Sequence, residues 1–149
     1  MALEYELTLA GATSLEELAE RALPDPAERP AGTESPLFVD LFERYGFAVW
    51  VSAGRNGYVD VETDSGAWEW EPDFYVSVTF RMDKFADSSW KVTNMLTVVR
   101  RVLGSGPEDA VLVLNSDVLL LTRFDGVLSK HRRNEWWDHY AGANDIVPG

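Results

Sequence analysis

The chain has 149 residues, no cysteine, and 25 acidic against 13 basic residues, which gives a formal net charge of −12. This length suits one ordinary domain that buries its own core, and the missing thiols exclude disulfide bonds, zinc–thiolate sites and cysteine catalysis. The acidity disfavours nucleic acid and anionic membranes and favours basic partners, unless it serves solubility alone.

The N-terminal segment alternates apolar and polar residues. This period of two over residues 3–9 predicts a half-buried strand, which Gly11 ends. The segment carries Glu4 and Glu6 and no base, unlike a signal peptide. No apolar run approaches the roughly 18 residues of a membrane helix, so a soluble cytoplasmic protein is predicted.

A short helix and a proline-rich loop follow. Thr13 or Ser14 can cap the helix, whose apolar stripe consists of Leu15, Leu18, Ala19 and Ala22. Residues 24–35 contain three prolines and a glycine, which predicts a loop.

Residues 36–45 allow two interpretations. Ser35 and Pro36 suit an N-cap followed by proline at the first helical position, and Gly46 can end a helix. The apolar residues on one face of that helix would be Leu37, Phe38, Leu41 and Phe42. We expect a helix here, with a strand as the alternative.

Strand patterns fill the middle of the chain. Residues 47–52 are rich in valine and aromatics, and Asn56-Gly57 is a strong hairpin signal. We therefore expect residues 58–61 to return beside that strand. Residues 74–82 alternate again and predict a further strand.

The clearest helix is predicted over residues 90–103. Asp87, Ser88 or Ser89 can cap its start, and Gly104 suits its C-terminal end. Helical spacing predicts that one face packs on a sheet, with Val92, Met95, Leu96, Val99, Val102 and Leu103.

The last part of the chain predicts an antiparallel meander and a tail. Turn signals separate three strands, over residues 111–114, 118–124 and 127–130, and a polar, tryptophan-rich tail covers residues 131–149. Because hairpins dominate, the predicted fold class is α+β. We expect a single domain over residues 1–149, with a mainly antiparallel sheet and two or three helices packed on one face.

The most distinctive segment is acidic and aromatic. Residues 60–71 read DVETDSGAWEWE, with five acids, two tryptophans, no base and a central Ser65-Gly66 that should turn. Acids steer a basic partner, and aromatics supply contact area. The predicted partner-binding residues are Asp60, Glu62, Asp64, Trp68, Glu69, Trp70, Glu71 and Asp73.

The side chains of this segment can be arranged in two ways. On an extended backbone, Glu69 and Glu71 lie on one face and Trp68 and Trp70 on the other, whereas a loop would project both sets outward. In a competing interpretation, both tryptophans are core residues and the acids only solvate a strand edge.

Two patterns in the tail have simpler explanations. On a helix, His131, Glu135 and His139 would stack and could bind a divalent metal ion, but a solvated tail is the simpler interpretation and no metal site is predicted. Bases precede Trp136 and Trp137, a pattern that can bind single-stranded nucleic acid. Given the net charge, we expect the tryptophans to fold back onto the sheet.

No catalytic pattern is recognisable in the sequence. Gly104-Ser105-Gly106 follows a predicted helix and precedes proline, so it does not fit a phosphate loop, and no serine lies in a nucleophile elbow. Glu69 and Glu71 could form an acid–base pair, but chance pairs are common in so acidic a chain. The acids do not have EF-hand spacing. A protein without enzymatic activity or cofactor is therefore predicted.

Four stretches of the chain resemble the Sit-type immunity proteins. They are the opening MALEYELTL, VSVTFRMDKF (76–85), NMLTVVRRVL (94–103) and AVLVLNSDVLLLTRFDG (110–126). Sit-type immunity proteins are bacterial and neutralise cognate toxins that pass between kin cells. The resemblance implies an immunity function, and it carries over no catalytic residue.

Charge and resemblance favour the same function. An immunity protein acts by binding, and an acidic one suits a basic toxin whose site it closes. The expected partner is a cognate protein toxin, with no nucleic acid and no membrane involved. The alternative is a small-ligand-binding or regulatory domain with a pocket between helix and sheet.

Overall fold

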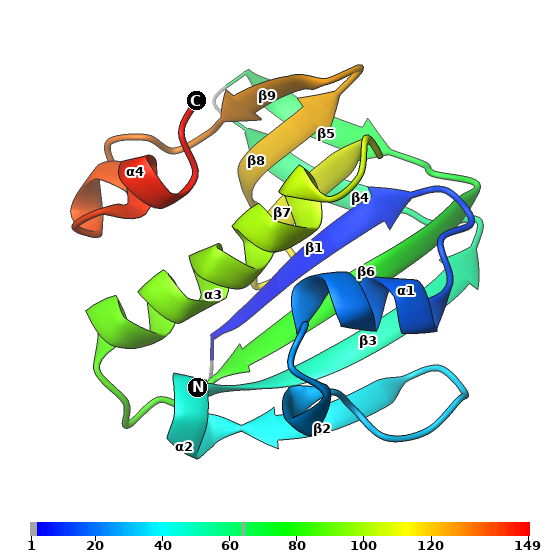
Figure 1. Cartoon of the computed structure of the whole chain (residues 1–149). Coiled ribbons are helices and arrows are strands. Elements are labelled where there is room, and N and C mark those ends of the chain that lie inside the picture. Colours follow the sequence, from blue (N-terminus) through cyan, green and yellow to red (C-terminus); the bar gives the residue numbers. More distant parts are fainter. Residues whose placement is uncertain (1–2, 64) are drawn as a thin grey trace.

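The computed structural model describes residues 3–63 and 65–149, and its centre is one sheet of nine strands (Figure 1). The strands are β1 (Glu4–Ala10), β2 (Leu37–Leu41), β3 (Phe47–Arg55), β4 (Val59–Thr63), β5 (Gly66–Trp70), β6 (Phe74–Met82), β7 (Ala110–Leu114), β8 (Val118–Phe124) and β9 (Val127–Lys130). Their order is β2-β3-β6-β1-β7-β8-β4-β5, with β9 also paired to β8. The pairings are antiparallel except for a short parallel contact between β4 and β8, which confirms the predicted mainly antiparallel sheet.

The two longer helices cover one face of this sheet. The helices are α1 (Leu15–Ala22), α2 (Phe42–Tyr45), α3 (Ser88–Gly104) and α4 (Ala143–Ile146), with short 3-10 helices at Pro26–Glu28 and Trp137–His139. Figure 1 shows α1 and α3 in front of the sheet, where they also contact each other. The predicted α+β class is confirmed. No helix among the described residues is both long and apolar enough to cross a membrane.

Helix α3 supplies most of the helical contribution to the core. Its predicted inward residues are all buried, namely Val92, Met95, Leu96, Val99, Val102 and Leu103. They join the inward residues of the central strands, such as Leu7, Val78 and Leu112, in one hydrophobic cluster. The amphipathic spacing seen in the sequence therefore determines how α3 lies on the sheet.

The N-terminus of α3 gives a direct test of this local structure. The Asp87 carboxylate accepts a hydrogen bond from the Trp90 backbone N–H at 2.9 Å, so Asp87 is the N-cap. Asp87→Ala should lower the free energy of unfolding by about 1 kcal/mol, because that N–H loses its partner. Urea denaturation measures the change. Ser88→Ala, one residue along, is the control and should cost less than about 0.5 kcal/mol; equal costs for the two variants would contradict the assignment of the cap.

The predicted helix over residues 36–45 is wrong, and the strand alternative is correct for most of it. Leu37–Leu41 forms β2, paired with β3 in the register Leu37↔Val51 to Leu41↔Phe47, and only α2 is helical. The apolar residues fit both periods, but Leu37 and Leu41 are buried while Phe38 is exposed. The strand forms here because β3 has a free edge, and pairing along it satisfies the backbone hydrogen-bonding groups of both strands.

The predicted hairpin at Asn56-Gly57 is also wrong. Both edges of β3 are already paired, one with β2 and the other with β6, so β4 cannot return beside it. Asn56 does take the left-handed conformation that the turn signal suggested, with φ 56°. The chain then leaves β3, and β4 pairs with β5 instead.

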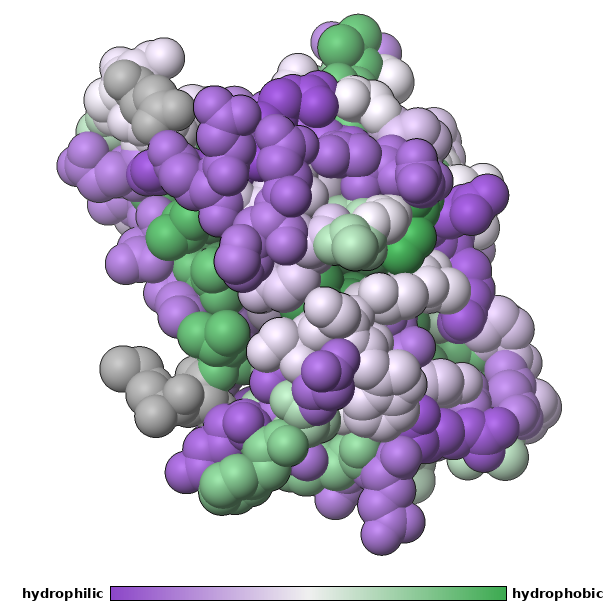
Figure 2. All heavy atoms as spheres, turned by 90° about the vertical axis from the view of Figure 1, so that its left-hand side faces the viewer, coloured by the Kyte–Doolittle hydropathy of each residue, from purple (hydrophilic) through white to green (hydrophobic). Residues whose placement is uncertain are grey.

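The tail folds back onto the helical face, as expected. Trp136 and Trp137 are buried, and their ring N–H groups donate to the Tyr5 hydroxyl (3.2 Å) and the Leu120 carbonyl (2.9 Å). Figure 2, viewed from the left-hand side of Figure 1, shows mostly hydrophilic residues over the upper part of this side of the molecule, where Figure 1 places the C-terminal segment. The tail turns its large apolar side chains inward, since Val147 is buried together with the two tryptophans.

The β4–β5 hairpin packs on the opposite face of the sheet. Val111 and Val113 of β7 point away from α3 and meet Val61 and Leu119 in a second, smaller hydrophobic cluster. This cluster fixes the position of the acidic segment of the chain.

Candidate functional site

The acidic segment forms a two-stranded hairpin whose side chains alternate. Val59 lies opposite Trp70, Val61 opposite Trp68, and Asp60 opposite Glu69. The first two pairs belong to the smaller hydrophobic cluster, whereas Asp60, Glu62 and Glu69 are exposed. The segment therefore has an apolar inner face and an acidic outer face, as alternation on an extended backbone predicts. Asp64 lies outside the described residues.

The two tryptophans of the hairpin are half-buried. The Trp68 and Trp70 rings lie 6.1 and 5.8 Å from the ring of Phe124, measured between centroids. They thus pack the hairpin onto β8. Their position combines features of both interpretations drawn from the sequence, because each side chain belongs to the small core yet keeps part of its surface in solvent.

Tyr58 sits among the acids at the start of the hairpin. It is exposed, and its hydroxyl donates to the Glu69 carboxylate at 3.1 Å. This hydrogen bond, together with the negative charges of Asp60, Glu69 and Glu71, raises the pKa of Tyr58. Tyr58 therefore lies close to predicted site residues of both strands, since Glu69 bonds it and Asp60 is the cross-strand neighbour of Glu69.

The remaining predicted acids lie at the base of the hairpin. Glu71 and Asp73 follow β5 and are exposed. The Asp73 backbone carbonyl accepts from the Asn56 N–H, and the Pro72 carbonyl from the Gly57 N–H. These two backbone bonds tie the base of the hairpin to the end of β3.

A groove of about 250 Å³ opens beside the hairpin base, on the face of the sheet that the helices leave uncovered. It is lined by Glu6, Thr8, Ser52, Tyr58, Tyr75 and Ser77, among others. The sequence prediction did not include Glu6 or Tyr58, although the alternation in residues 3–9 already placed Glu6 on the polar side of its strand. Strands far apart in the sequence build this groove, so no local pattern predicts it.

The histidine pattern in the tail is not on an α-helix. Residues 131–140 form turns and a short 3-10 helix, so His131, Glu135 and His139 do not stack as a helix would require. The Glu135 carboxylate instead accepts from Arg132 at 3.3 Å. Over the part of the chain that the structure describes, no three His, Asp or Glu side chains are grouped to hold a metal ion.

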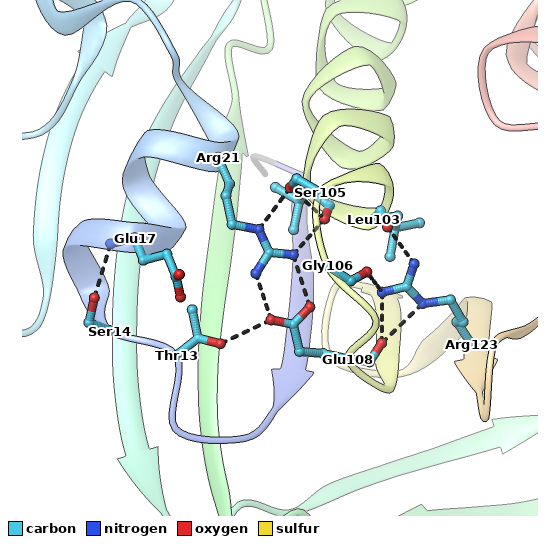
Figure 3. A network of polar contacts seen from close by, with 10 residues as sticks. Thr13, Ser14, Glu17, Arg21, Leu103, Ser105, Gly106, Glu108 and Arg123 are labelled. Atoms are coloured by element: carbon cyan, nitrogen blue, oxygen red, sulfur yellow. Dashed lines mark hydrogen bonds and ion pairs between the residues drawn. The ribbon is translucent and has the colours of Figure 1, made fainter.

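A network of buried and half-buried polar groups joins α1, the end of α3 and β8 (Figure 3). The Arg21 guanidinium donates to both Glu108 carboxylate oxygens, at 2.6 and 2.9 Å, and Thr13 donates to the same carboxylate at 3.0 Å. Arg123 donates to the carbonyls of Leu103, Gly106 and Glu108.

This network stabilises the fold by linking α1, the end of α3 and β8. Hydrogen bonds from Arg21 lower the pKa of Glu108 to about 2, so its carboxylate stays ionised at neutral pH and is held in this ion pair. The bonds from Arg123 satisfy the Leu103 carbonyl in the last turn of α3 and the Gly106 carbonyl just after the helix. We therefore place the candidate site at the hairpin and its groove.

The hairpin and its groove thus combine an exposed acidic face with a polar groove. The family model described as SitI3-like matches residues 3–141, a range that includes the whole hairpin. The chain therefore belongs to the SitI3-like family, which is a family of Sit-type immunity proteins. No curated protein and no solved structure matches the chain.

Proposed function

We propose that the chain is a bacterial, cytoplasmic immunity protein that neutralises a basic cognate toxin by stoichiometric, non-catalytic binding. Its contact surface is the outer face of the β4–β5 hairpin, with Asp60, Glu62 and Glu69 on the strands and Glu71 and Asp73 at the base. Trp68 and Trp70 support this face from below and offer their exposed parts to the partner. Family membership supports the immunity function and a toxin partner in general.

The pairing of Asp60 with Glu69 is the observation that carries the choice of surface. These two carboxylates occupy directly opposite positions on neighbouring strands. Like charges in such positions destabilise a sheet by a few tenths of a kcal/mol up to about 1 kcal/mol. No base occurs from Tyr58 to Asp73 to relieve that repulsion. A local conflict of this kind is typical of a surface kept for binding rather than for stability.

Charge reversal on the hairpin tests the proposal. The candidate toxin is the product of the neighbouring gene, and the test variant carries Glu69→Lys together with Glu71→Lys. We expect the association rate constant to fall about 10-fold or more at low salt, because the acids steer a basic partner. Stopped-flow measurements at several salt concentrations should show the difference shrinking, since charges are screened over about 8 Å at physiological ionic strength.

A second variant with the same change of charge separates steering by the hairpin from the effect of net charge. Glu20→Lys with Glu34→Lys alters two exposed acids outside the hairpin. It should slow association less than the hairpin variant does. Equal effects of the two variants would place the contact elsewhere, and unchanged association in both would rule out the acidic surface. A lysine at position 69 would lie opposite Asp60 and replace a like-charge pair by an opposite-charge pair, which favours folding of the hairpin variant.

The alternative function, a ligand pocket between helix and sheet, has less support. That interface is filled by side chains with no exposed surface, including Met95, Leu96 and Val99 of α3. A ligand there would have to displace packed core residues, at a cost of several kcal/mol.

A further inference from the structure

The groove beside the hairpin has a floor of hydroxyl groups. Ser52, Ser77 and Thr8 lie side by side on β3, β6 and β1, with Ser77 in register with both neighbours. All three line the groove. Ser77 is only 3% exposed, and its hydroxyl makes no hydrogen bond with the residues that the structure describes. Because this hydroxyl lines the groove, it can form a hydrogen bond with a polar group that enters there.

The wall of the groove is shaped for an aromatic ring. A Cβ atom at Gly54 would come within 2.6 Å of the Tyr75 hydroxyl oxygen, and one at Gly57 within 2.8 Å of the Tyr75 ring. Only glycine at these two positions leaves room for the ring where it lies. The Tyr75 side chain is thus seated against backbone and presents a fixed surface to the groove.

The charge in the groove comes from Glu6. It is the one ionisable acid or base among the described lining residues apart from the two tyrosines. Its carboxylate accepts hydrogen bonds from Thr79 at 3.2 Å and from Thr8 at 3.5 Å, which hold it at the groove. Neither threonine neutralises the negative charge, so the groove attracts cations more than anions.

We propose that this groove receives an arginine side chain of the partner. A guanidinium group carries five N–H donors in a plane, which suits the Glu6 carboxylate and the hydroxyl floor together, and its face can lie on the Tyr75 ring. Tyr58 lines the groove and bonds Glu69, so the groove continues the acidic face of the hairpin. This inference rests on the proposed function, because it names the chemistry of the partner at that surface.

The first test needs no toxin. N-acetyl-arginine amide is titrated into ¹⁵N-labelled protein, and N-acetyl-citrulline amide serves as the neutral probe of the same shape. We expect saturable shifts of the Thr8, Ser52 and Ser77 amide signals with a dissociation constant on the order of 1–10 mM, as for a single side chain. The citrulline probe should bind at least about 5-fold more weakly. Absence of saturable shifts with arginine, or equal binding of both probes, would overturn the proposal.

Two matched variants complete the test. Glu6→Gln should lose most of the arginine response, whereas Glu4→Gln, on the same strand but outside the groove lining, should keep it. An equal loss in both would mean that charge in general attracts the probe, and would overturn the assigned site. With the neighbouring gene product, a toxin affinity that falls on hairpin charge reversal but not in Glu6→Gln would refute only the arginine groove. Affinity unchanged in both would refute the proposed function as well.

Discussion

Replacing Trp137 by alanine is expected to lower the free energy of unfolding by about 3–5 kcal/mol. The side chain is fully buried, with its ring 4.9 Å from that of Trp136 and 4.6 Å from the Lys130 ammonium. Its N–H donates to the Leu120 carbonyl at 2.9 Å. Alanine would leave a cavity and take away that donor, and it would detach the tail from β8. Urea denaturation followed by circular dichroism measures the loss without relying on tryptophan fluorescence.

Two variants show which part of the side chain matters. Trp137→Phe keeps most of the ring and loses the N–H group, so it should cost about 1–3 kcal/mol. Trp90→Ala removes a tryptophan that is 41% exposed and should cost less than about 1 kcal/mol. If Trp137→Ala were as mild as Trp90→Ala, the tail would not be part of the cooperative fold in solution.

Glu108→Gln is expected to lower the free energy of unfolding at pH 7 by about 2–3 kcal/mol, because it leaves the Arg21 guanidinium largely buried without its counter-charge. The Arg21 and Glu108 side chains are 11% and 14% exposed. Arg21 lowers the Glu108 pKa from 4.5 to about 2, so the folded state favours the ionised carboxylate. The stabilisation is complete above about pH 4.5 and is lost as the pH falls through the folded-state pKa near 2.

The measurement is unfolding by urea across pH 2–7. The difference between wild type and Glu108→Gln should be largest at neutral pH and should shrink towards pH 2. Glu135→Gln is the matched control, since Glu135 is exposed and its ion pair with the half-buried Arg132 should contribute at most about 1 kcal/mol. A difference between wild type and Glu108→Gln that stays constant with pH would mean that the carboxylate gains nothing from its charge in the folded protein.

Local signals predicted the elements whose character does not depend on a distant partner. Ser14 caps α1 and Asp87 caps α3, and both caps are readable from a few neighbouring residues. The turns at Asn115-Ser116 and Asp125-Gly126 join β7, β8 and β9 as expected, with positive φ at Asn115 and Asp125. The hydrogen bonds and backbone conformations of these caps and turns involve only neighbouring residues, so a short stretch of sequence is sufficient to predict them.

Prediction failed where two local preferences were nearly equal. Leu37–Leu41 fits a helix and a strand alike, and β2 forms because β3 offers a free edge. Asn56-Gly57 turns the chain, but β6 already occupies the edge where a hairpin partner would lie. Whether this edge of β3 is free depends on β6, which lies about 20 residues further along the chain. The residues around the turn therefore cannot predict how the chain continues.

For the candidate site, the sequence alone was sufficient to predict the acidic composition, the alternation of acids and tryptophans, and the family to which the chain belongs. Which face of the hairpin meets solvent could be known only from the folded chain, because it depends on Val111, Val113 and Leu119 of other strands. The groove also forms only in the folded chain, because its lining residues Glu6, Ser52 and Ser77 come from three strands. Side-chain alternation is a property of each strand, whereas burial and proximity are created by strand pairing, which brings distant residues together.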